Sequence, residues 1–237
     1  MRFQRKEKYT IDDLLKIMEI LRSPEGCPWD RQQTHQSIRN NLIEETYEAV
    51  EAIDTADKVL LREELGDVLL QVVFHAQLEK EKGGFDFSDV ADGVAKKLIE
   101  RHPHVFGDVS VRDSEEVLKN WDAIKMRAKG RKTLADVLEG VSPALPALMR
   151  SQKLRKKAAK AAGQTIRFQE TALGVRDAVR QIEKLPDSAK PEDKMEKVGK
   201  LLFSAVGIAE SCEIEAEQAL AEFCSRFVRQ YKTENRG

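Results

Sequence analysis

The chain has 237 residues, of which 41% are hydrophobic, 34% charged and 6% aromatic, the composition of an ordinary soluble protein. Its formal net charge of −1 excludes a global electrostatic attraction to nucleic acid or to a membrane surface. Three sparse cysteines exclude a disulfide framework and fit no zinc spacing. No apolar run is long enough for a signal peptide or a membrane span, so we expect a cytoplasmic protein.

Apolar residues recur at helical spacing through the first half of the chain. Thr10 is a candidate cap for a helix that begins at Ile11, and residues 23–26 end it. We expect residues 27–30 to form an irregular loop. Further helices are predicted to end near Asp54, Lys82 and Arg101, at the positions where turn residues or Pro103 stop the pattern. No segment alternates with period two for long, so the sequence predicts an all-α fold.

The second half repeats this pattern. Another helix is predicted over about 114–129, and Ser142-Pro143 is predicted to open the next one. A basic run along that helix is either a solvated linker surface or a surface for phosphate or an oligomer partner. The stretch 196–203 resembles 63–70, and each follows an upstream helix. We therefore divide the chain into a first unit over 1–110, a helical connector over 111–142 and a second, similar unit over 143–237.

Four acidic residues in the first unit form two pairs with the same spacing. Glu45 and Glu48 are three residues apart, so they lie on one face of their helix. Glu64 and Asp67 repeat this spacing on the next helix. The connection between the helices is short, which predicts antiparallel neighbours whose acidic faces meet.

An acidic helix face is often only a solvated surface, but the residues that follow Asp67 argue for a metal site. The stretch 68–74 is apolar almost all round, so we expect it to be buried and its acidic neighbours to lose hydration. A divalent cation offsets the resulting repulsion. Carboxylates without imidazole or thiolate select a hard ion such as Mg²⁺, with Mn²⁺ as a substitute. A di-iron bundle would need Glu-x-x-His pairs, which the sequence lacks.

The pattern EExxE, a spacer and then ExxD resembles the all-α nucleoside triphosphate pyrophosphohydrolases, and specifically the two-domain MazG proteins. The resemblance covers most of the chain. In the first unit its motifs are GCPWD at 26–30, QT at 33–34, EETYE at 44–48, EELGD at 63–67 and RHPHVF at 101–106.

This resemblance implies two helical units of the four-helix-bundle type, completed by dimerisation. It implies Mg²⁺-dependent hydrolysis of ordinary or aberrant NTPs and dNTPs to a nucleoside monophosphate and pyrophosphate. It also implies roles for individual residues. The metal ligands are Glu45, Glu48, Glu64 and Asp67, the phosphate-binding cations are Lys97 and Arg101, and Glu44 or Glu45 orients or deprotonates the attacking water.

The nucleoside would be held by residues near the start of the first unit. Trp29 either stacks on the base or packs within its loop, and Asp30 or Asn41 is a candidate hydrogen-bonding partner for the base edge. We expect a homodimer with no nucleic-acid or membrane partner. The competing hypothesis is a nucleotide-binding or protein-interaction scaffold without significant catalysis.

The second unit departs from the family pattern at the ligand positions. With a spacer three residues shorter, Gln181 and Lys184 match Glu45 and Glu48. Two further lysines, Lys197 and Lys200, match Glu64 and Asp67. Three of the four ligands would then be cations, so the sequence predicts that the second unit binds no magnesium and serves as structure.

Overall fold

The computed structural model describes residues 3–114, 116–117, 120–121, 124 and 133–234. The chain divides into two compact units, Met1–Ile124 and Lys125–Gly237, which are described separately here. Within the described residues the regular elements are all helices, which confirms the predicted all-α fold.

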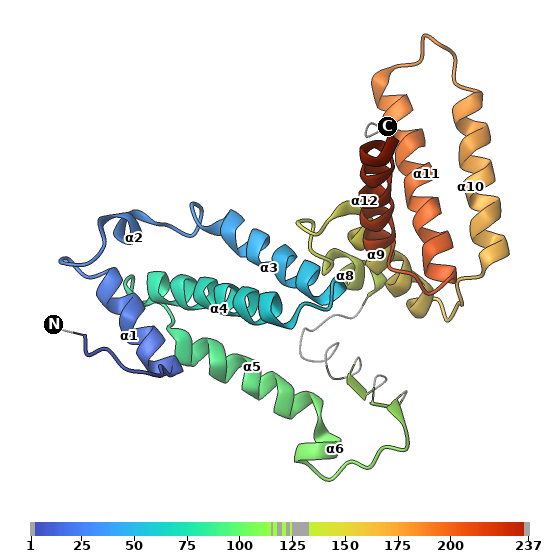
Figure 1. Ribbon diagram of the computed structural model, residues 1–237. Coiled ribbons are helices and arrows are strands. Elements are labelled where there is room, and N and C mark those ends of the chain that lie inside the picture. Colours follow the sequence, from blue (N-terminus) through green and yellow to red (C-terminus); the bar gives the residue numbers. More distant parts are fainter. Residues whose placement is uncertain (1–2, 115, 118–119, 122–123, 125–132, 235–237) are drawn as a thin grey trace. The chain divides into compact units, whose positions relative to one another are not determined.

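The first unit is built around an antiparallel hairpin of two long helices, α3 (Arg39–Asp54) and α4 (Lys58–Lys80), which lie side by side in Figure 1. Asp57 caps α4 by accepting hydrogen bonds from the backbone N–H groups of Val59 and Leu60. The other described helices of the first unit are α1 (Ile11–Leu21), α2 (Pro28–Gln32), α5 (Phe87–Arg101) and α6 (Pro103–Phe106). Thr10 caps α1 as predicted, in a capping box with Asp13.

The hydrophobic core of this unit lies at the C-terminal half of α4. Met18 of α1 and Ile38 before α3 pack with Val73, Phe74 and Leu78. The N-terminal half of α4 packs on α3. There Leu65 and Leu69 remain 54% and 38% exposed. The expectation that the apolar stretch 68–74 is buried throughout is therefore wrong at Leu69, because the described residues of the first unit leave this side chain partly uncovered.

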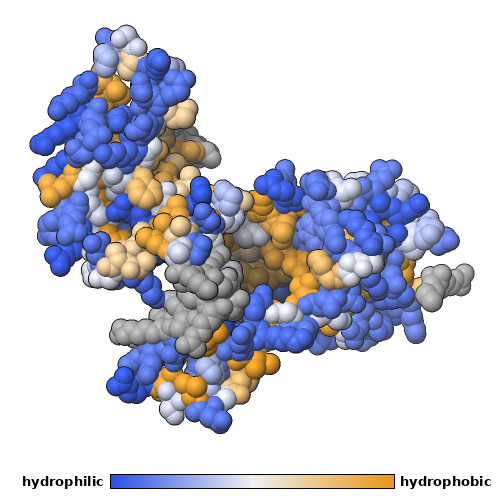
Figure 2. All heavy atoms as spheres, turned by 180° about the vertical axis from the view of Figure 1, so that it is seen from behind, coloured by the Kyte–Doolittle hydropathy of each residue, from blue (hydrophilic) through white to orange (hydrophobic). Residues whose placement is uncertain are grey.

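A stripe of exposed apolar residues also runs along α3. It consists of Ile43, Tyr47, Val50 and Ile53, between 42% and 60% exposed. Their spacing places them on one helix face. Hydrophobic residues are also exposed among mostly hydrophilic ones on the face of the molecule drawn in Figure 2, in which no element is labelled. This stripe is a candidate interface for a partner.

The second unit contains a similar hairpin, formed by α10 (Phe168–Glu183) and α11 (Pro191–Ser211). Its other helices are α8 (Leu134–Glu139), α9 (Ala147–Ala161) and α12 (Ala216–Glu234). Gln152 of α9 is buried and ties α9 to the turn before α12. Its amide donates to the carbonyl of Ile214 at 2.8 Å and accepts from the N–H of Ala216 at 2.9 Å.

Two local predictions are wrong. Residues 28–32 form the short helix α2 instead of an irregular loop, because Pro28 at its first position has a backbone angle suited to a helix start. The helix predicted to open at Ser142-Pro143 begins only at Ala147, since Pro146 disfavours helical backbone in the residue before it. Most of the helix predicted over 114–129 lies outside the described residues.

Candidate metal centre

Three acidic side chains from the two helices of the hairpin converge. Glu45 and Glu48 of α3 and Glu64 of α4 each offer a carboxylate oxygen, and these oxygens all lie within 4.8 Å of one another. Among the described residues this is the group of His, Cys, Asp and Glu side chains whose geometry suits a metal ion. Asp67 lies one turn after Glu64 and is the charged neighbour that acts most strongly on Glu45.

The protein itself leaves this cluster electrostatically unsatisfied. Burial, and then the neighbouring carboxylates, raises the pKa of Glu45 and of Glu64 above the ordinary range. Glu64 is 7% exposed, and its buried Oε2 has no hydrogen-bond partner among the described residues. Buried polar atoms are rarely left in this state without a ligand or water.

A hard divalent cation fits this set of groups. All the donor atoms are carboxylate oxygens, which Mg²⁺ and Mn²⁺ prefer. The orphaned Oε2 of Glu64 offers a free ligand atom at the cluster. A cation there would also remove the repulsion that raises the two pKa values.

The other residues with predicted roles lie around this cluster or away from it. Glu44 is exposed on α3, and its charge contributes to the raised pKa of Glu45. Asn41 is half-buried one turn earlier on the same helix. Trp29 is 59% exposed, so its indole is not packed away inside its segment. Asp30 follows it in α2.

The two predicted phosphate-binding cations are on α5, and the described residues show no contact between either of them and the carboxylates. Lys97 is exposed. The Arg101 guanidinium lies over the ring of Trp121, 5.2 Å from its centroid. Within one chain, the structure therefore brings the acidic residues together but not these cations.

An arginine that the sequence analysis did not single out holds the Trp29 segment in place. Arg22 forms a double ion pair with Glu81, with N–O distances of 2.8 and 2.7 Å. Arg22 also donates to the backbone carbonyls of Asp30 and Gln33. Its side chain is 6% exposed. This residue therefore links the ends of α1 and α4 to the segment that carries Trp29.

A pair of histidines gives this segment a second anchor. The Nδ1 atoms of His35 and His75 are 2.7 Å apart, and His35 Nε2 lies 2.7 Å from a carboxylate oxygen of Glu79. Hydrogen bonding to His35 lowers the pKa of Glu79, so this carboxylate accepts a hydrogen bond from the N–H group at His35 Nε2. The Nδ1–Nδ1 contact then requires one ring to donate and the other to accept.

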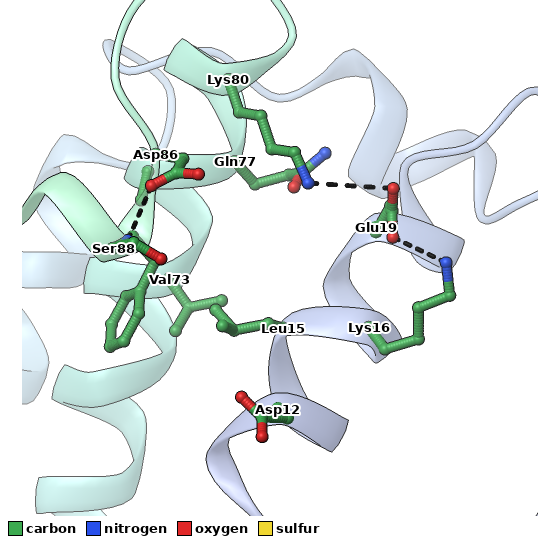
Figure 3. A pocket seen from close by; sticks show the side chains of 11 residues that line it. Asp12, Leu15, Lys16, Glu19, Val73, Gln77, Lys80, Asp86 and Ser88 are labelled. Carbon is green, nitrogen blue, oxygen red and sulfur yellow. Dashed lines mark hydrogen bonds and ion pairs between the residues drawn. The ribbon is translucent and has the colours of Figure 1, made fainter.

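A small cavity of about 250 Å³ opens between α1, α4 and the start of α5 (Figure 3). Glu19 sits at its edge between two lysines, 2.7 Å from Lys16 and 3.9 Å from Lys80. The α4 residues that line it belong to the C-terminal half of the helix, whereas Glu64 and Asp67 lie in its N-terminal half and the other two carboxylates lie on α3. The cavity is therefore separate from the acidic cluster.

In the second hairpin an ion pair occupies the place of the acidic cluster. Lys200 Nζ lies 3.3 Å from a carboxylate oxygen of Asp177, and the Gln181 amide donates to the same carboxylate at 2.7 Å. Lys200 matches Asp67 in the sequence comparison, so at the position of one proposed metal ligand the second hairpin carries a cation that is paired with a carboxylate.

Comparisons with known proteins point to one protein family for this chain. Residues 33–106 match the family model described as the MazG nucleotide pyrophosphohydrolase domain, and this range contains all four carboxylates. Over 223 residues the chain is 41% identical to a nucleoside triphosphate pyrophosphohydrolase/pyrophosphatase MazG from Thermotoga maritima, with 93% of this chain and 84% of the relative covered.

Two further proteins are similar. A nucleoside triphosphate pyrophosphohydrolase from Escherichia coli K12 is 41% identical over 233 residues, with 94% of this chain and 86% of the relative covered. A crystal structure of a mazG-related protein from Thermotoga maritima matches 48% of this chain and 98% of its own at 30% identity, with a TM-score of 0.42. From its sequence similarity to the two pyrophosphohydrolases over most of its length, the chain is a hydrolase that belongs to the MazG family of nucleoside triphosphate pyrophosphohydrolases.

Proposed function

We propose that this protein hydrolyses ordinary or aberrant NTPs and dNTPs to nucleoside monophosphate and pyrophosphate, with Mg²⁺ held by Glu45, Glu48, Glu64 and Asp67. The observation that carries the proposal is the convergence of carboxylate oxygens from Glu45, Glu48 and the buried Glu64, inside the segment that matches the family model. When bound, Mg²⁺ would supply charge neutralisation at the phosphate oxygens.

We assign the positioning of the attacking water to Glu45 or to the adjacent Glu44. Glu45 belongs to the acidic cluster and Glu44 precedes it on α3, so a carboxylate at this point would accept a proton from a water molecule close to the metal ion. Attack in line at the α-phosphate would leave pyrophosphate as the departing group. Its developing negative charge would be neutralised by Lys97 and Arg101.

We assign the nucleoside to the segment around α2. The exposed indole of Trp29 is available to stack on a base, and Asp30 or Asn41 offers hydrogen bonds to the base edge. Arg22 and the His35–His75 pair hold this segment against α1 and α4. The base would then lie next to a segment whose position is fixed by these contacts.

We propose that the protein acts in the cytoplasm as a homodimer. The exposed stripe on α3 supports dimerisation, because four apolar residues on one face are a candidate contact with a second copy. A partner subunit would also be a source of cations for the carboxylates, which Lys97 and Arg101 of the same chain do not contact. The described helices include none long and apolar enough to cross a bilayer.

The ion pair in the second hairpin favours one competing function. A chain that has lost one of two acidic sites resembles a scaffold that binds nucleotide without turnover. Two measurements distinguish these functions. The first is thermal unfolding with Mg²⁺ and with Mg²⁺ plus a non-hydrolysable NTP, and the second is pyrophosphate release from NTP. The proposed enzyme is stabilised by the ligands and also releases pyrophosphate, whereas stabilisation without any product would support the scaffold.

A further inference from the structure

A pocket of about 650 Å³ lies within the second unit, among α8, α9, α10 and α11. Ligand pockets for small molecules have volumes of about 300–1,000 Å³. Its walls are mostly apolar and include Leu134, Leu138, Leu154, Ile166 and Phe203.

Small residues keep this pocket open. Ala158, Ala159 and Ala162 form its α9 side, and Gly174 lies on its α10 side. A Cβ atom added to Gly174 would meet only Ser204 Oγ, at an ordinary contact distance of 3.9 Å. The space next to Gly174 is therefore free to accept a larger side chain.

One wall of the pocket carries a guanidinium with unused hydrogen-bonding capacity. Arg155 is half-buried, and its buried Nε has no hydrogen-bond partner among the described residues. Its Nη1 donates to the carbonyl of Phe203 at 3.5 Å, the outer limit for such a bond. The guanidinium also lies over the Phe203 ring, 5.2 Å from its centroid.

The carboxylate of Glu210, whose charge acts on Arg155, does not fill this hydrogen-bonding capacity. Burial lowers the pKa of Arg155, and the carboxylate of Glu210 offsets this only in part. Glu210 lies 3.7 Å from Lys156, and its buried Oε2, like Arg155 Nε, has no hydrogen-bond partner among the described residues. The described residues also contain no ion pair to Arg155. A half-buried guanidinium without an ion-pair partner beside an apolar space is a candidate site for an anionic group.

We propose that this pocket binds a small organic monoanion, in which an apolar body fills the space and a carboxylate or phosphate monoester pairs with Arg155. A nucleoside triphosphate does not fit this description, because its several charges would face mainly apolar walls. Arg167 at the rim already has an acidic neighbour, Glu170, at 3.8 Å. The second unit would thus be a ligand-binding module whose site does not depend on the hydrolase site.

The test uses a matched pair of probes, 1-naphthoate and its neutral analogue 1-naphthamide, titrated into the full-length protein by calorimetry. We expect one naphthoate site per chain and a dissociation constant at least about tenfold lower than for naphthamide, since a charge-assisted bond is much stronger than a neutral one. Absence of naphthoate binding at millimolar concentration, or equal affinity for the two probes, overturns the proposal.

Three variants locate the site. Arg155→Met should weaken naphthoate binding by at least about tenfold and leave naphthamide within about twofold. Gly174→Phe retains the guanidinium but fills the pocket, so both probes should lose binding while the circular-dichroism melt stays cooperative. Arg176→Met, which changes an exposed arginine of α10 outside the pocket, should alter neither affinity. Naphthoate binding that survives Gly174→Phe, or that falls equally in Arg176→Met, contradicts the assignment.

Discussion

Glu64 is a residue whose role in function opposes its effect on stability. It is buried, one of its oxygens has no partner, and its pKa is raised by burial and by nearby carboxylates. The stability contributed by a carboxyl whose folded pKa is raised is fully present below its unfolded pKa and is lost as the pH rises through its folded pKa. In the absence of metal, the ionised form of Glu64 therefore destabilises the first unit.

The Glu64→Gln variant should separate these two effects. We expect kcat to fall by at least about 100-fold, because loss of a metal ligand costs more than the 10–100-fold typical of an outer-shell partner. Without metal, the melting temperature at pH 7 should stay equal or rise, since a repelled charge has been removed. The stabilisation of the wild-type protein by Mg²⁺ should be lost in the variant.

The adjacent Glu63→Gln is the matched control, because this exposed neighbour lies outside the acidic group. It should retain turnover and the Mg²⁺ response. Wild-type turnover in Glu64→Gln, or an equal loss in Glu63→Gln, would show that the cluster is not the metal site.

At the scale of elements, Arg22 determines where the α2 segment lies. Its guanidinium joins Glu81 at the end of α4 to the carbonyls of Asp30 and Gln33. Arg22→Leu should lower the free energy of unfolding by about 2 kcal/mol, less than the 3–5 kcal/mol for a fully buried pair because Glu81 is one-third exposed. Because the segment that carries Trp29 would lose its contacts with Arg22, the KM for NTP should rise by a larger factor than kcat falls. Chemical denaturation and steady-state kinetics measure both; an unchanged KM would separate α2 from substrate binding.

The same ion pair predicts a dependence of stability on pH. The hydrogen bond from Arg22 is the main cause that lowers the pKa of Glu81 below its ordinary value. A lowered carboxyl pKa contributes stability above the unfolded pKa, and this stability is lost as the pH falls through the folded one. The difference in unfolding free energy between wild type and Arg22→Leu should thus be full at pH 7 and shrink below about pH 4. A difference that is constant over this range would contradict the ion pair.

The sequence predicted the elements whose signals are local. Residue spacing within one helix predicts the long helices and the i,i+3 pairs Glu45–Glu48 and Glu64–Asp67. The residue type at the helix start predicts the Thr10 cap. Contacts between distant residues left no such signal. The pairing of His35 with His75 and the reach of Arg22 to Glu81 depend on how α1, α4 and the α2 segment pack.

An ion pair in the second hairpin shows the same limit. The contact between Lys200 and Asp177 depends on how α11 packs on α10, and no spacing within one helix predicts it. The places of Lys97 and Arg101 came from the family resemblance alone, and they remain predictions.

At the scale of the molecule, the two units are predicted to differ in function. Lys200→Ala should change kcat by less than about twofold and stability by less than about 1 kcal/mol, because the exposed Lys200–Asp177 pair contributes little and the proposed metal ligands lie in the first unit. Pyrophosphate release and thermal melts measure these quantities. A tenfold loss of turnover would mean that the second unit takes part in catalysis.

Dimerisation is also a property of the whole molecule. Val50→Glu places a charge in the exposed stripe on α3 and should shift the protein from dimer to monomer in sedimentation velocity. Glu51→Gln, on an exposed neighbour outside the stripe, should leave the dimer intact. If Val50→Glu remains a dimer, or the wild type is a monomer, the stripe is not the dimer interface.

The proposed reaction is tested most directly by hydrolysis of an NTP with Mg²⁺ in ¹⁸O-labelled water, with mass spectrometry of the products. Attack of water at the α-phosphate predicts one ¹⁸O atom in the nucleoside monophosphate and unlabelled pyrophosphate, with no product formed by Glu64→Gln. Label in orthophosphate with nucleoside diphosphate as the other product, or undiminished product from Glu64→Gln, would contradict the account.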